Sequence, residues 1–541
     1  MSPQIPEPKN ETGLGYAPGS KERKLLQEAI AKLENDSIEI PAVIGGKEVK
    51  TGDMAECIQP HEHQQILAKY HKTGAKEVDM AIKASQAAKK DWENMPYPMR
   101  SSIFLKAAEL LSTKYRYQVN AATMLGQSKN VFQAEIDAAC ELIDFLNFNV
   151  YFMEKIYAEQ PLISPKGIWN YVEYRALEGF VFAVTPFNFT AIAGNLPTSP
   201  AMMGNTVIWK PSSTAVFSNY FLFKVLQEAG LPDGVINFLP GSGAAVGDPV
   251  IDSPYFSGIH FTGSTAVFQE MWRKIGNNIS KYKTYPRIVG ETGGKDFVFV
   301  HSSADPQETA TALVRGAFEY QGQKCSAASR AYIPDDLWQS IKERMAADLA
   351  TIKMGHVNDF MNFVNAVIDQ PSFDKIRSTI KHAETSNESE VIFGGNCDDS
   401  IGYFIEPTVI LARNPRFKLM EEEIFGPVLT VYVYPSKKYE ETLELCDATS
   451  MYGLTGAIFA RDRKAISTAL NALRHAAGNF YINDKPTGAV VGQQPFGGSR
   501  GSGTNDKAGS MQNLLRWSSA RAIKETFNPP TDYRYPFMGY R

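Results

Sequence analysis

The chain has 541 residues, of which 43% are hydrophobic and 21% charged, and its formal net charge is −4. At about 150 residues per domain, this length predicts two to four domains. The chain lacks the excess of basic residues that is typical of proteins that bind nucleic acid or an anionic membrane surface. We therefore expect neither partner.

The N-terminal segment, residues 1–20, is rich in proline, glycine and polar residues and carries Glu7 and Glu11 but no arginine. It has the features of neither a signal peptide nor an arginine-rich transit peptide. The most apolar stretch, residues 179–194, is interrupted by polar residues and falls short of the ~20 apolar residues of a membrane helix. We therefore expect a soluble intracellular protein, in the mitochondrial matrix of a eukaryote or the cytoplasm of a bacterium.

Five cysteines are scattered along the chain, and none forms a CxxC pair. An odd, dispersed set argues against a disulfide framework or a zinc site and favours a reducing compartment. The eight histidines show no metal-ligand spacing either, so we expect no bound metal.

The first 160 residues are mostly helical by pattern. Apolar residues recur at three- and four-residue spacing in residues 21–34, 75–92 and 131–156. This is the period of a helix that buries one face, and it predicts three long helices.

From Gly179 onward, short apolar strands alternate with helices. Strands are predicted at residues 181–184, 206–209, 235–238 and 258–261, and a helix at residues 215–229. A second series follows Lys295, with a strand at residues 297–300 and a helix at residues 306–320, and it continues to Asn483. Such alternation predicts parallel sheets built from right-handed βαβ units.

Two stretches fit neither series. Residues 168–175 alternate with period two, and residues 514–525 have some strand character. A strand pair that stands away from a domain exposes an edge, which proteins normally cover. Because a partner subunit would cover it, we expect a homodimer or a larger homo-oligomer.

Cys325 lies among small and polar residues, with Lys324 before it and Ser326 after it. A packing cysteine usually has apolar neighbours, whereas a catalytic thiol needs an approachable, electropositive pocket that lowers its pKa. The local pattern alone favours neither interpretation. Lys324 could support the thiolate or a substrate carboxylate, or it could be a structurally paired lysine.

Glu291 lies between glycines, where a carboxylate can move towards a thiol and serve as a general base, although a capping glutamate fits equally well. Asn188 follows the first strand of the α/β series and could donate a hydrogen bond to an oxyanion or form an Asx turn. Lys210 ends the next strand and could bind ribose or phosphate, or be a solvated surface lysine.

Gly263 and Ser264 join a strand to a predicted helix. Glycine permits close approach of a ligand, and serine can cap a helix whose N-terminus attracts a pyrophosphate. Glu423 could accept hydrogen bonds from a ribose or belong to a turn, and Phe496 could form a pocket wall or pack within its loop. Residues 241–247 are interpreted as a plain loop because their glycine spacing differs from GxGxxG.

Each of these motifs is ambiguous alone, but their order is not. They are TPFNF (185–189), WKPS (209–212), FTGST (261–265), GETGGK (290–295), GQKCSA (322–327), EEIFGPV (422–428) and PFGG (495–498). In order and approximate spacing they resemble the aldehyde dehydrogenase superfamily. Within it the chain looks like the Δ1-pyrroline-5-carboxylate dehydrogenases, through stretches such as residues 318–330 and 476–509, and the resemblance runs from about Gly19 to the C-terminus.

The resemblance implies an α/β fold of the aldehyde dehydrogenase type. A Rossmann-type NAD-binding domain would comprise residues 1–160 and 177–290, and an α/β catalytic domain would comprise residues 291–482. Residues 161–176 and 510–541 would form a β-strand oligomerisation arm, with residues 483–509 as the active-site loop and the return to the first domain.

The resemblance also implies catalytic roles. Cys325 would be the nucleophile and Glu291 the base for hydrolysis, while Asn188 and the Cys325 backbone N–H would form the oxyanion hole. NAD would be held by Thr185, Lys210, Gly263, Ser264 and Glu423, with Lys210 and Glu423 at the riboses and Ser264 at the pyrophosphate. Ser213 stands where many NAD-linked relatives carry a glutamate that reads the adenosine 2′-hydroxyl.

The implied substrate is L-glutamate γ-semialdehyde, the open form of Δ1-pyrroline-5-carboxylate, which would be oxidised to L-glutamate in the second step of proline degradation. Ser326 and the backbone of Gly488 and Ala489 would receive its α-carboxylate, and Phe189 and Phe496 would sandwich its aliphatic part. The alternatives are another semialdehyde or fatty aldehyde, a non-enzymatic descendant of the fold, and a cysteine protease. A cysteine protease would need a histidine as its base, and no motif in the sequence identifies one.

Overall fold

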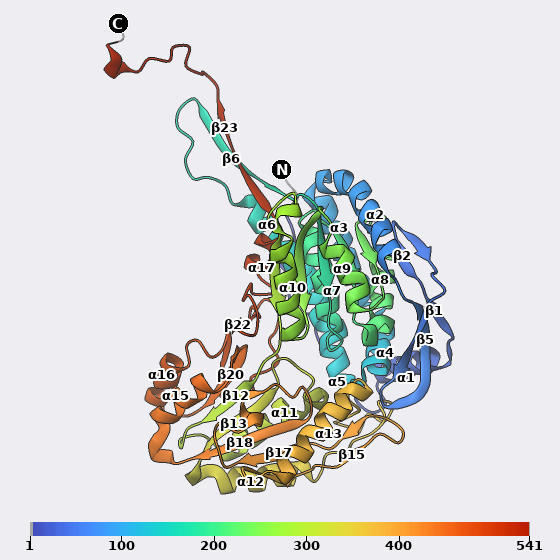
Figure 1. The fold of residues 1–541 in the computed structure, drawn as a ribbon, viewed down its shortest axis with the longest axis vertical. Coiled ribbons are helices and arrows are strands. Elements are labelled where there is room, and N and C mark those ends of the chain that lie inside the picture. Colours follow the sequence, from blue (N-terminus) through green and yellow to red (C-terminus); the bar gives the residue numbers. More distant parts are fainter. Residues whose placement is uncertain (1–3, 540–541) are drawn as a thin grey trace.

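Two seven-stranded sheets, each with helices packed against it, organise the computed structural model, which describes residues 4–539 (Figure 1). The first sheet has the order β11-β10-β7-β8-β9-β2-β3. Its strands are β11 (Arg287–Glu291), β10 (Phe256–Thr262), β7 (Phe180–Val184), β8 (Thr206–Lys210), β9 (Ile236–Phe238), β2 (Ala42–Ile44) and β3 (Lys47–Val49). The five strands from β11 to β9 are parallel, and β2 and β3 join antiparallel at one edge.

The second sheet has the order β14-β17-β18-β13-β12-β20-β21. Its strands are β14 (Ser389–Phe393), β17 (Thr408–Ala412), β18 (Val428–Tyr434), β13 (Ala328–Pro334), β12 (Asp296–Val300), β20 (Thr455–Phe459) and β21 (Asn479–Ile482). All neighbours are parallel except β14, which pairs antiparallel with β17. The central strands β12 and β13 are almost wholly buried, as expected for a sheet covered on both faces.

The helices of the first half cover its sheet and supply most of its core. They are α1 (Lys21–Asn35), α2 (Ala75–Asn94), α3 (Tyr97–Ser112), α4 (Arg116–Gln127), α5 (Val131–Ala134), α6 (Leu142–Ala158), α7 (Thr190–Met202), α8 (Val216–Ala229), α9 (Gly243–Ile251) and α10 (Thr265–Asn277). A π-helical turn at Glu135–Glu141 joins α5 to α6. Such turns are frequent at functional sites.

The helices of the second half pack on the second sheet. They are α11 (Pro306–Phe318), α12 (Asp335–Leu349), α13 (Gln370–Thr385), α14 (Lys418–Glu421), α15 (Tyr439–Thr449) and α16 (Arg463–Ala472). The short helix α17 (Met511–Leu515) returns to the first half and packs on α6. Within residues 4–539 no helix has both the length and the apolar character that crossing a bilayer requires.

The structure confirms the predicted parallel sheets and the long helices α1, α2 and α6, while the helix predicted at residues 131–156 is interrupted by the π turn. The sequence interpretation missed the strands before residue 72, which include a small sheet of β1 (Ile38–Ile40), β5 (Glu62–His71) and β4 (Met54–Gln59). These strands are very short or carry polar residues on both faces, so they show no clear period.

The loop predicted at residues 241–247 is wrong from Gly243 onward, where α9 (Gly243–Ile251) begins. Ser242 accepts a hydrogen bond from Ala245 N at 3.3 Å and caps α9, which begins at Gly243. An N-cap serine fixes a helix start even where the following residues are glycine and alanine.

A pair of antiparallel strands, far apart in the sequence, projects from the body of the molecule (Figure 1). It consists of β6 (Ile168–Arg175) and β23 (Ser519–Thr526), paired antiparallel from Arg175 opposite Ser519 to Ile168 opposite Thr526. Within the expected arm range of residues 510–541, Trp517 is buried in the core of the first half, so the projecting strand begins only after it.

A buried ion pair ties several of these elements together. Lys129 Nζ lies 2.6 Å from Asp137 Oδ2, and both side chains are fully buried. Asp137, on the π turn, also accepts hydrogen bonds from the backbone N–H groups of Thr190 and Ala191 at 3.0 and 2.8 Å. The carboxylate therefore caps the N-terminus of α7, where a negative charge is stabilised by the helix dipole.

We expect Lys129→Ala to destabilise the protein by about 3–5 kcal/mol, because it leaves the Asp137 carboxylate buried without its counter-ion. The midpoint of urea unfolding, followed by circular dichroism, measures the effect. Lys83→Ala is the matched control, since Lys83 pairs with Asp79 at 2.6 Å on the exposed face of α2. Its unfolding midpoint should equal that of the wild type, and an equal loss in both variants would contradict the expectation.

Candidate active site

Cys325 lies in the turn between α11 and the central strand β13. Tyr320 and Gln321, which precede Cys325 in this turn, adopt left-handed backbone conformations with φ of 51° and 55°. This turn approaches the segment after β11 so closely that a Cβ at Gly294 would lie 2.2 Å from the Cys325 carbonyl oxygen. Only glycine fits there, which explains the glycine that follows Gly293 in the GETGGK motif.

A cavity of about 400 Å³ opens beside Cys325, a size suited to a small metabolite. Lys324 and seven of the candidate catalytic and substrate-binding residues line it, the seven being Phe189, Glu291, Cys325, Ser326, Gly488, Ala489 and Phe496. They come from five separate parts of the chain. The fold therefore brings the candidate nucleophile, the candidate base and the candidate substrate-binding groups to one cavity.

Glu291 is the last residue of β11, not part of a flexible loop. Its burial raises the pKa of the carboxyl group well above its usual range. One carboxyl oxygen, Oε2, makes no hydrogen bond to any group within residues 4–539. A carboxyl group with a raised pKa on a residue that lines a cavity is suited to exchange a proton with a bound molecule.

The groups around Cys325 within residues 4–539 do not form the electropositive pocket that would lower the pKa of a thiol. Burial raises the pKa of the thiol well above its usual range, and the nearby carboxyl groups of Asp296, Glu291 and Glu423 act in the same direction. The thiol is half-buried and lines the cavity. It is reachable, but its surroundings favour the neutral form.

Lys324 does not supply the missing positive charge. Its Nζ lies 3.1 Å from Glu319 Oε2, and both side chains are buried. Lys485 lies 3.9 Å from the same oxygen and donates to the Thr487 carbonyl at 3.0 Å. Of the two interpretations of Lys324, the structurally paired lysine is therefore the one that the contacts support.

Asn188 is buried beside the Cys325 turn. Its Nδ2 donates to the backbone carbonyl of Gln323 at 3.1 Å. The amide thus lies next to the thiol-bearing segment, as an oxyanion donor requires, but here it is engaged with the backbone. Because the amide nitrogen carries two hydrogens, the second N–H remains available to donate to an oxyanion.

The candidate cofactor residues gather at the carboxyl ends of the parallel strands of the first sheet. Thr185 follows β7, Lys210 ends β8, and Gly263 and Ser264 follow β10. The strand order reverses between β7 and β10, and open α/β sheets bind ligands at such a reversal. The Gly263 N–H also donates to the Glu291 carbonyl at 3.2 Å, which joins this group to the cavity.

These residues fit a nucleotide. Lys210 is buried, and burial lowers its pKa to about 8. Its Nζ donates to the Pro211 carbonyl at 2.9 Å, and no carboxylate within residues 4–539 pairs with it. Ser264 caps the 13-residue helix α10 through a hydrogen bond from Val267 N, and such an N-terminus attracts phosphate.

Glu423 lies between α14 and β18 of the second half and contacts the segment that follows β11. Its Oε1 accepts a hydrogen bond from the Gly294 N–H at 2.9 Å, and a Cβ at Gly293 would collide with its carboxylate. Burial raises its pKa. Thr185, by contrast, has its hydroxyl engaged, since it accepts a hydrogen bond from Trp209 Nε1 at 3.0 Å.

Comparison with known proteins decides what kind of site this is. A model of the aldehyde dehydrogenase family matches residues 48–523. The chain belongs to the aldehyde dehydrogenase family. The resemblance inferred from the ordered motifs is thereby confirmed.

Members of this family with similar sequences carry consistent names. The chain is 58% identical over 536 residues to the mitochondrial Δ1-pyrroline-5-carboxylate dehydrogenase of Dictyostelium discoideum, covering 99% of this chain and 96% of that protein. It is 50% identical over 530 residues to the mitochondrial protein of the same name from Bos taurus, covering 98% and 94%.

A solved structure confirms the predicted aldehyde dehydrogenase fold. The Δ-pyrroline-5-carboxylate dehydrogenase of Mycobacterium tuberculosis, bound with NAD, superposes with a TM-score of 0.96 at 52% identity. The match covers 99% of each chain. The fold class is therefore that of the aldehyde dehydrogenase family.

The sequence analysis did not identify several residues that line the cavity of this aldehyde dehydrogenase family member. Cys140 and Glu141 come from the π turn, Asp144 from α6, and Asn10 and Glu11 from the N-terminal segment. No local pattern marks them, because a π turn has no distinct sequence period and the N-terminal segment forms neither helix nor strand.

Alkylation of Cys325 by iodoacetamide should accelerate with pH from about pH 6 to about pH 9, by about tenfold per unit, because only the thiolate reacts and the raised pKa keeps its fraction small. Peptide mass spectrometry resolves the labelled site, with Cys325→Ala as the control. A labelling rate independent of pH would mean that the thiol is already ionised.

Proposed function

We propose that this protein oxidises L-glutamate γ-semialdehyde to L-glutamate, with NAD as the electron acceptor, through a thioester on Cys325. The names of the relatives across nearly the whole chain support the substrate, and the NAD-bound relative supports the cofactor. The reaction is the second step of proline degradation, in which Δ1-pyrroline-5-carboxylate first opens by hydrolysis.

One observation carries the proposal. The cavity places the Cys325 thiol beside groups suited to hold an α-carboxylate, namely the Ser326 hydroxyl and the backbone of Gly488 and Ala489. Ser326 Oγ lies 2.8 Å from Thr487 Oγ1, so the hydroxyl is held against the loop that carries the two backbone groups. An aldehyde that is tethered to a carboxylate fits this pairing better than a simple aliphatic aldehyde does.

The remaining walls suit the rest of such a molecule. Phe189 and Phe496 line the cavity and can enclose an aliphatic chain. Glu141, a carboxyl group on the π turn, also lines it, and burial raises its pKa to about 8. A substrate ammonium group placed there would stabilise the carboxylate form, because an opposite charge lowers the pKa of a carboxyl group.

Cys325 attacks the aldehyde carbon as the thiolate and forms a thiohemiacetal. The Cys325 N–H and the second N–H of the Asn188 amide, which keeps its hydrogen bond to Gln323, donate to the oxyanion. One such donor is typically worth about 10²–10³ in rate. The confined cavity holds the aldehyde against the thiol and excludes bulk water from this step.

NAD, when bound, accepts a hydride from the thiohemiacetal carbon. Lys210 and Glu423 hold its two riboses, and Ser264, with the backbone at Gly263, holds its pyrophosphate beside Thr185. These residues lie at the carboxyl ends of β7, β8 and β10 or beside the segment after β11, and Glu291, at the end of the adjacent strand β11, lines the cavity.

Glu291 then takes a proton from water, and the resulting hydroxide attacks the thioester. The C–S bond breaks, the carboxylate of glutamate leaves, and the thiolate of Cys325 is regenerated. Because the base must be ionised and its pKa is raised, hydrolysis becomes faster as the pH rises.

NADH production from chemically prepared Δ1-pyrroline-5-carboxylate, compared with propanal and succinate semialdehyde, tests the proposal. We expect the highest kcat/KM for the amino-acid semialdehyde and no turnover by Cys325→Ala. Faster turnover of propanal would refute the substrate, and activity that survives the alanine substitution would refute the mechanism.

The Glu291→Gln variant should give a burst of NADH and then stall, because its thioester is not hydrolysed. Absence of the burst would assign Glu291 an earlier role.

We also propose that the β6–β23 strand pair joins two copies of the chain, because no residue of either strand is buried. Replacing residues 519–526 with a glycine–serine linker should convert a dimer or larger oligomer to a monomer in sedimentation velocity. A wild-type chain that sediments as a monomer would refute this assembly.

We infer that the protein resides in the mitochondrial matrix if its source is a eukaryote, and in the cytoplasm if it is a bacterium. Relatives from Dictyostelium discoideum and Bos taurus are named mitochondrial. Cell fractionation followed by immunoblotting would detect the protein elsewhere if the inference is wrong.

A further inference from the structure

The segment that precedes α1 forms part of the wall of the catalytic cavity. Asn10, Glu11 and Gly13 line the same cavity as Cys325 and Ser326. From residue 4 to residue 16 the segment forms neither helix nor strand. Its position therefore depends on side-chain contacts with the elements beneath it. We call residues 4–16 the N-terminal strap.

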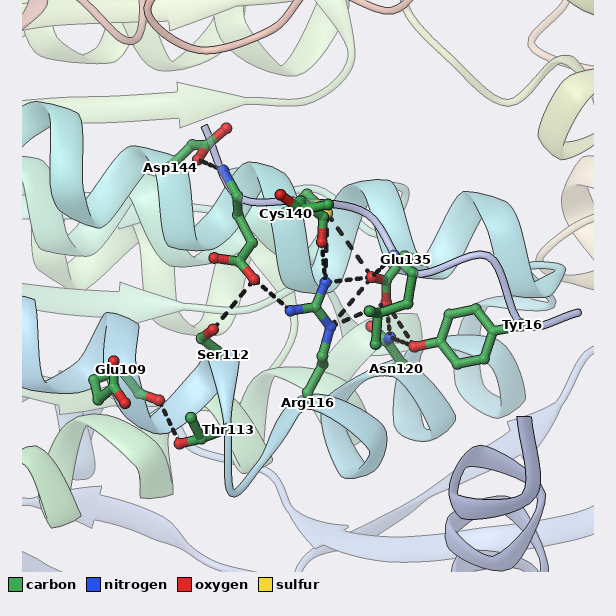
Figure 2. A network of polar contacts seen from close by, with 12 residues as sticks. Tyr16, Glu109, Ser112, Thr113, Arg116, Asn120, Glu135, Cys140 and Asp144 are labelled. Carbon is green, nitrogen blue, oxygen red and sulfur yellow. Dashed lines mark hydrogen bonds and ion pairs between the residues drawn. The ribbon is translucent and has the colours of Figure 1, made fainter. Parts of the chain in front are cut away.

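Both ends of the strap are fastened to the helices. Near its start, Ile5 is buried and its N–H donates to Glu154 Oε1 on α6 at 3.2 Å. At its end, the buried Tyr16 donates its hydroxyl hydrogen to Glu135 Oε2 at 2.7 Å, and the Leu14 N–H donates to Glu135 Oε1 at 2.8 Å. Figure 2 shows Tyr16 and Glu135 in this network.

Arg116, on α4, fastens the middle of the strap (Figure 2). Its buried guanidinium pairs with Glu135 and with Glu11 Oε1, and it donates to the Thr12 carbonyl at 2.8 Å. Ser112 Oγ donates to the same Glu11 oxygen at 3.2 Å. Since hydrogen bonds to charged groups are stronger than neutral ones, the strap is held in one place.

Asp144 and Asn10 connect the strap to the loop that carries Gly488 and Ala489. Asp144 accepts hydrogen bonds from the Glu11 N–H at 2.7 Å and from Asn10 Nδ2 at 2.8 Å. Asn10 Nδ2 also donates to the Val491 carbonyl at 2.8 Å, and Asn10 Oδ1 accepts from Gln493 Nε2 at 2.9 Å. The Asn10 amide thus uses both its nitrogen and its oxygen to hold that loop.

The loop needs such support because no sheet or helix holds it. Residues 486–494 contain no regular secondary structure, and Gly488 adopts a left-handed conformation with φ of 99°. Apart from the hydrogen bond between Thr487 Oγ1 and Ser326 Oγ at 2.8 Å, the other hydrogen bonds of this loop within residues 4–539 are local, such as the one from Gln494 N to the Val490 carbonyl at 3.0 Å. A small displacement of backbone groups that bind a substrate can cost a large factor in rate.

We propose that Asn10 is a positioning residue, through which the N-terminal strap sets the geometry of the carboxylate-binding loop at Gly488 and Ala489. The inference rests on the proposed function only where it names the substrate group that the loop binds. The mechanical part, that Asn10 orders residues 486–494, is independent of any substrate.

The test compares Asn10→Ala with the control Lys9→Ala, since Lys9 is the exposed neighbour on the same strap. We expect Asn10→Ala to raise KM for glutamate semialdehyde by about tenfold, the effect of losing hydrogen bonds that hold a binding group. The KM for propanal, which has no carboxylate, should change by less than about twofold. Lys9→Ala should match the wild type with both substrates.

A second measurement uses the protein without substrate. Amide hydrogen exchange of the peptide that covers residues 486–494 should be faster in Asn10→Ala than in Lys9→Ala, because a lost restraint permits more frequent local opening. Unchanged exchange would overturn the proposal. Raised KM with unchanged exchange would mean that Asn10 contacts the substrate directly instead of positioning the loop.

Failure of the proposed function and failure of this inference give different results. If the wild type does not oxidise the semialdehyde, the proposed function fails, while the exchange experiment still decides whether Asn10 orders the loop. If the wild type is active and Asn10→Ala matches it in both KM and exchange, the inference alone fails. An equal rise of KM for both aldehydes would also refute it, because positioning of a carboxylate-binding loop must discriminate between them.

Discussion

The buried ion pair between Lys129 and Asp137 is the interaction on which the catalytic side of the structure depends. Asp137 caps α7 and so fixes the turn that carries Asn188. Lys129 Nζ lies 4.0 Å from the ring centre of Phe189 and 4.5 Å from that of Tyr320. One charge pair thereby connects the oxyanion side of the site, an aromatic wall of the cavity and the turn that precedes Cys325.

The same burial shapes the acid–base chemistry of the site. It raises the pKa values of both Cys325 and Glu291, so the chain alone favours a neutral thiol and a protonated carboxyl group. Both groups must lose a proton at some stage of the proposed reaction. Ligands that bring positive charge to the site would therefore assist it, and a cavity that is open to a small molecule supplies the place for them.

Convergence of distant segments is a second constraint. The cavity takes Glu291 from the end of β11, Cys325 from the turn before β13, the backbone groups from residues 486–494 and a wall from the N-terminal strap. Close approach between these segments depends on glycine, as at Gly294 against the Cys325 carbonyl. Irregular segments of this kind can be placed accurately only when buried polar groups hold them, and Arg116 and Asp144 do so for the strap.

The sequence by itself determined the family, the parallel sheets and several of the residues that meet in the cavity, because ordered motifs and hydrophobic periods are local properties. Tertiary structure decided the rest. Whether Lys324 faces the thiol or Glu319, and whether the pKa of Cys325 is lowered or raised, depends on burial and on neighbours that are remote along the chain. The roles of the π turn and of Asn10 were also hidden, since a hydrogen bond between residues 10 and 491 leaves no pattern in either segment. The physical reason is that desolvation and long-range hydrogen bonding exist only once the chain has folded.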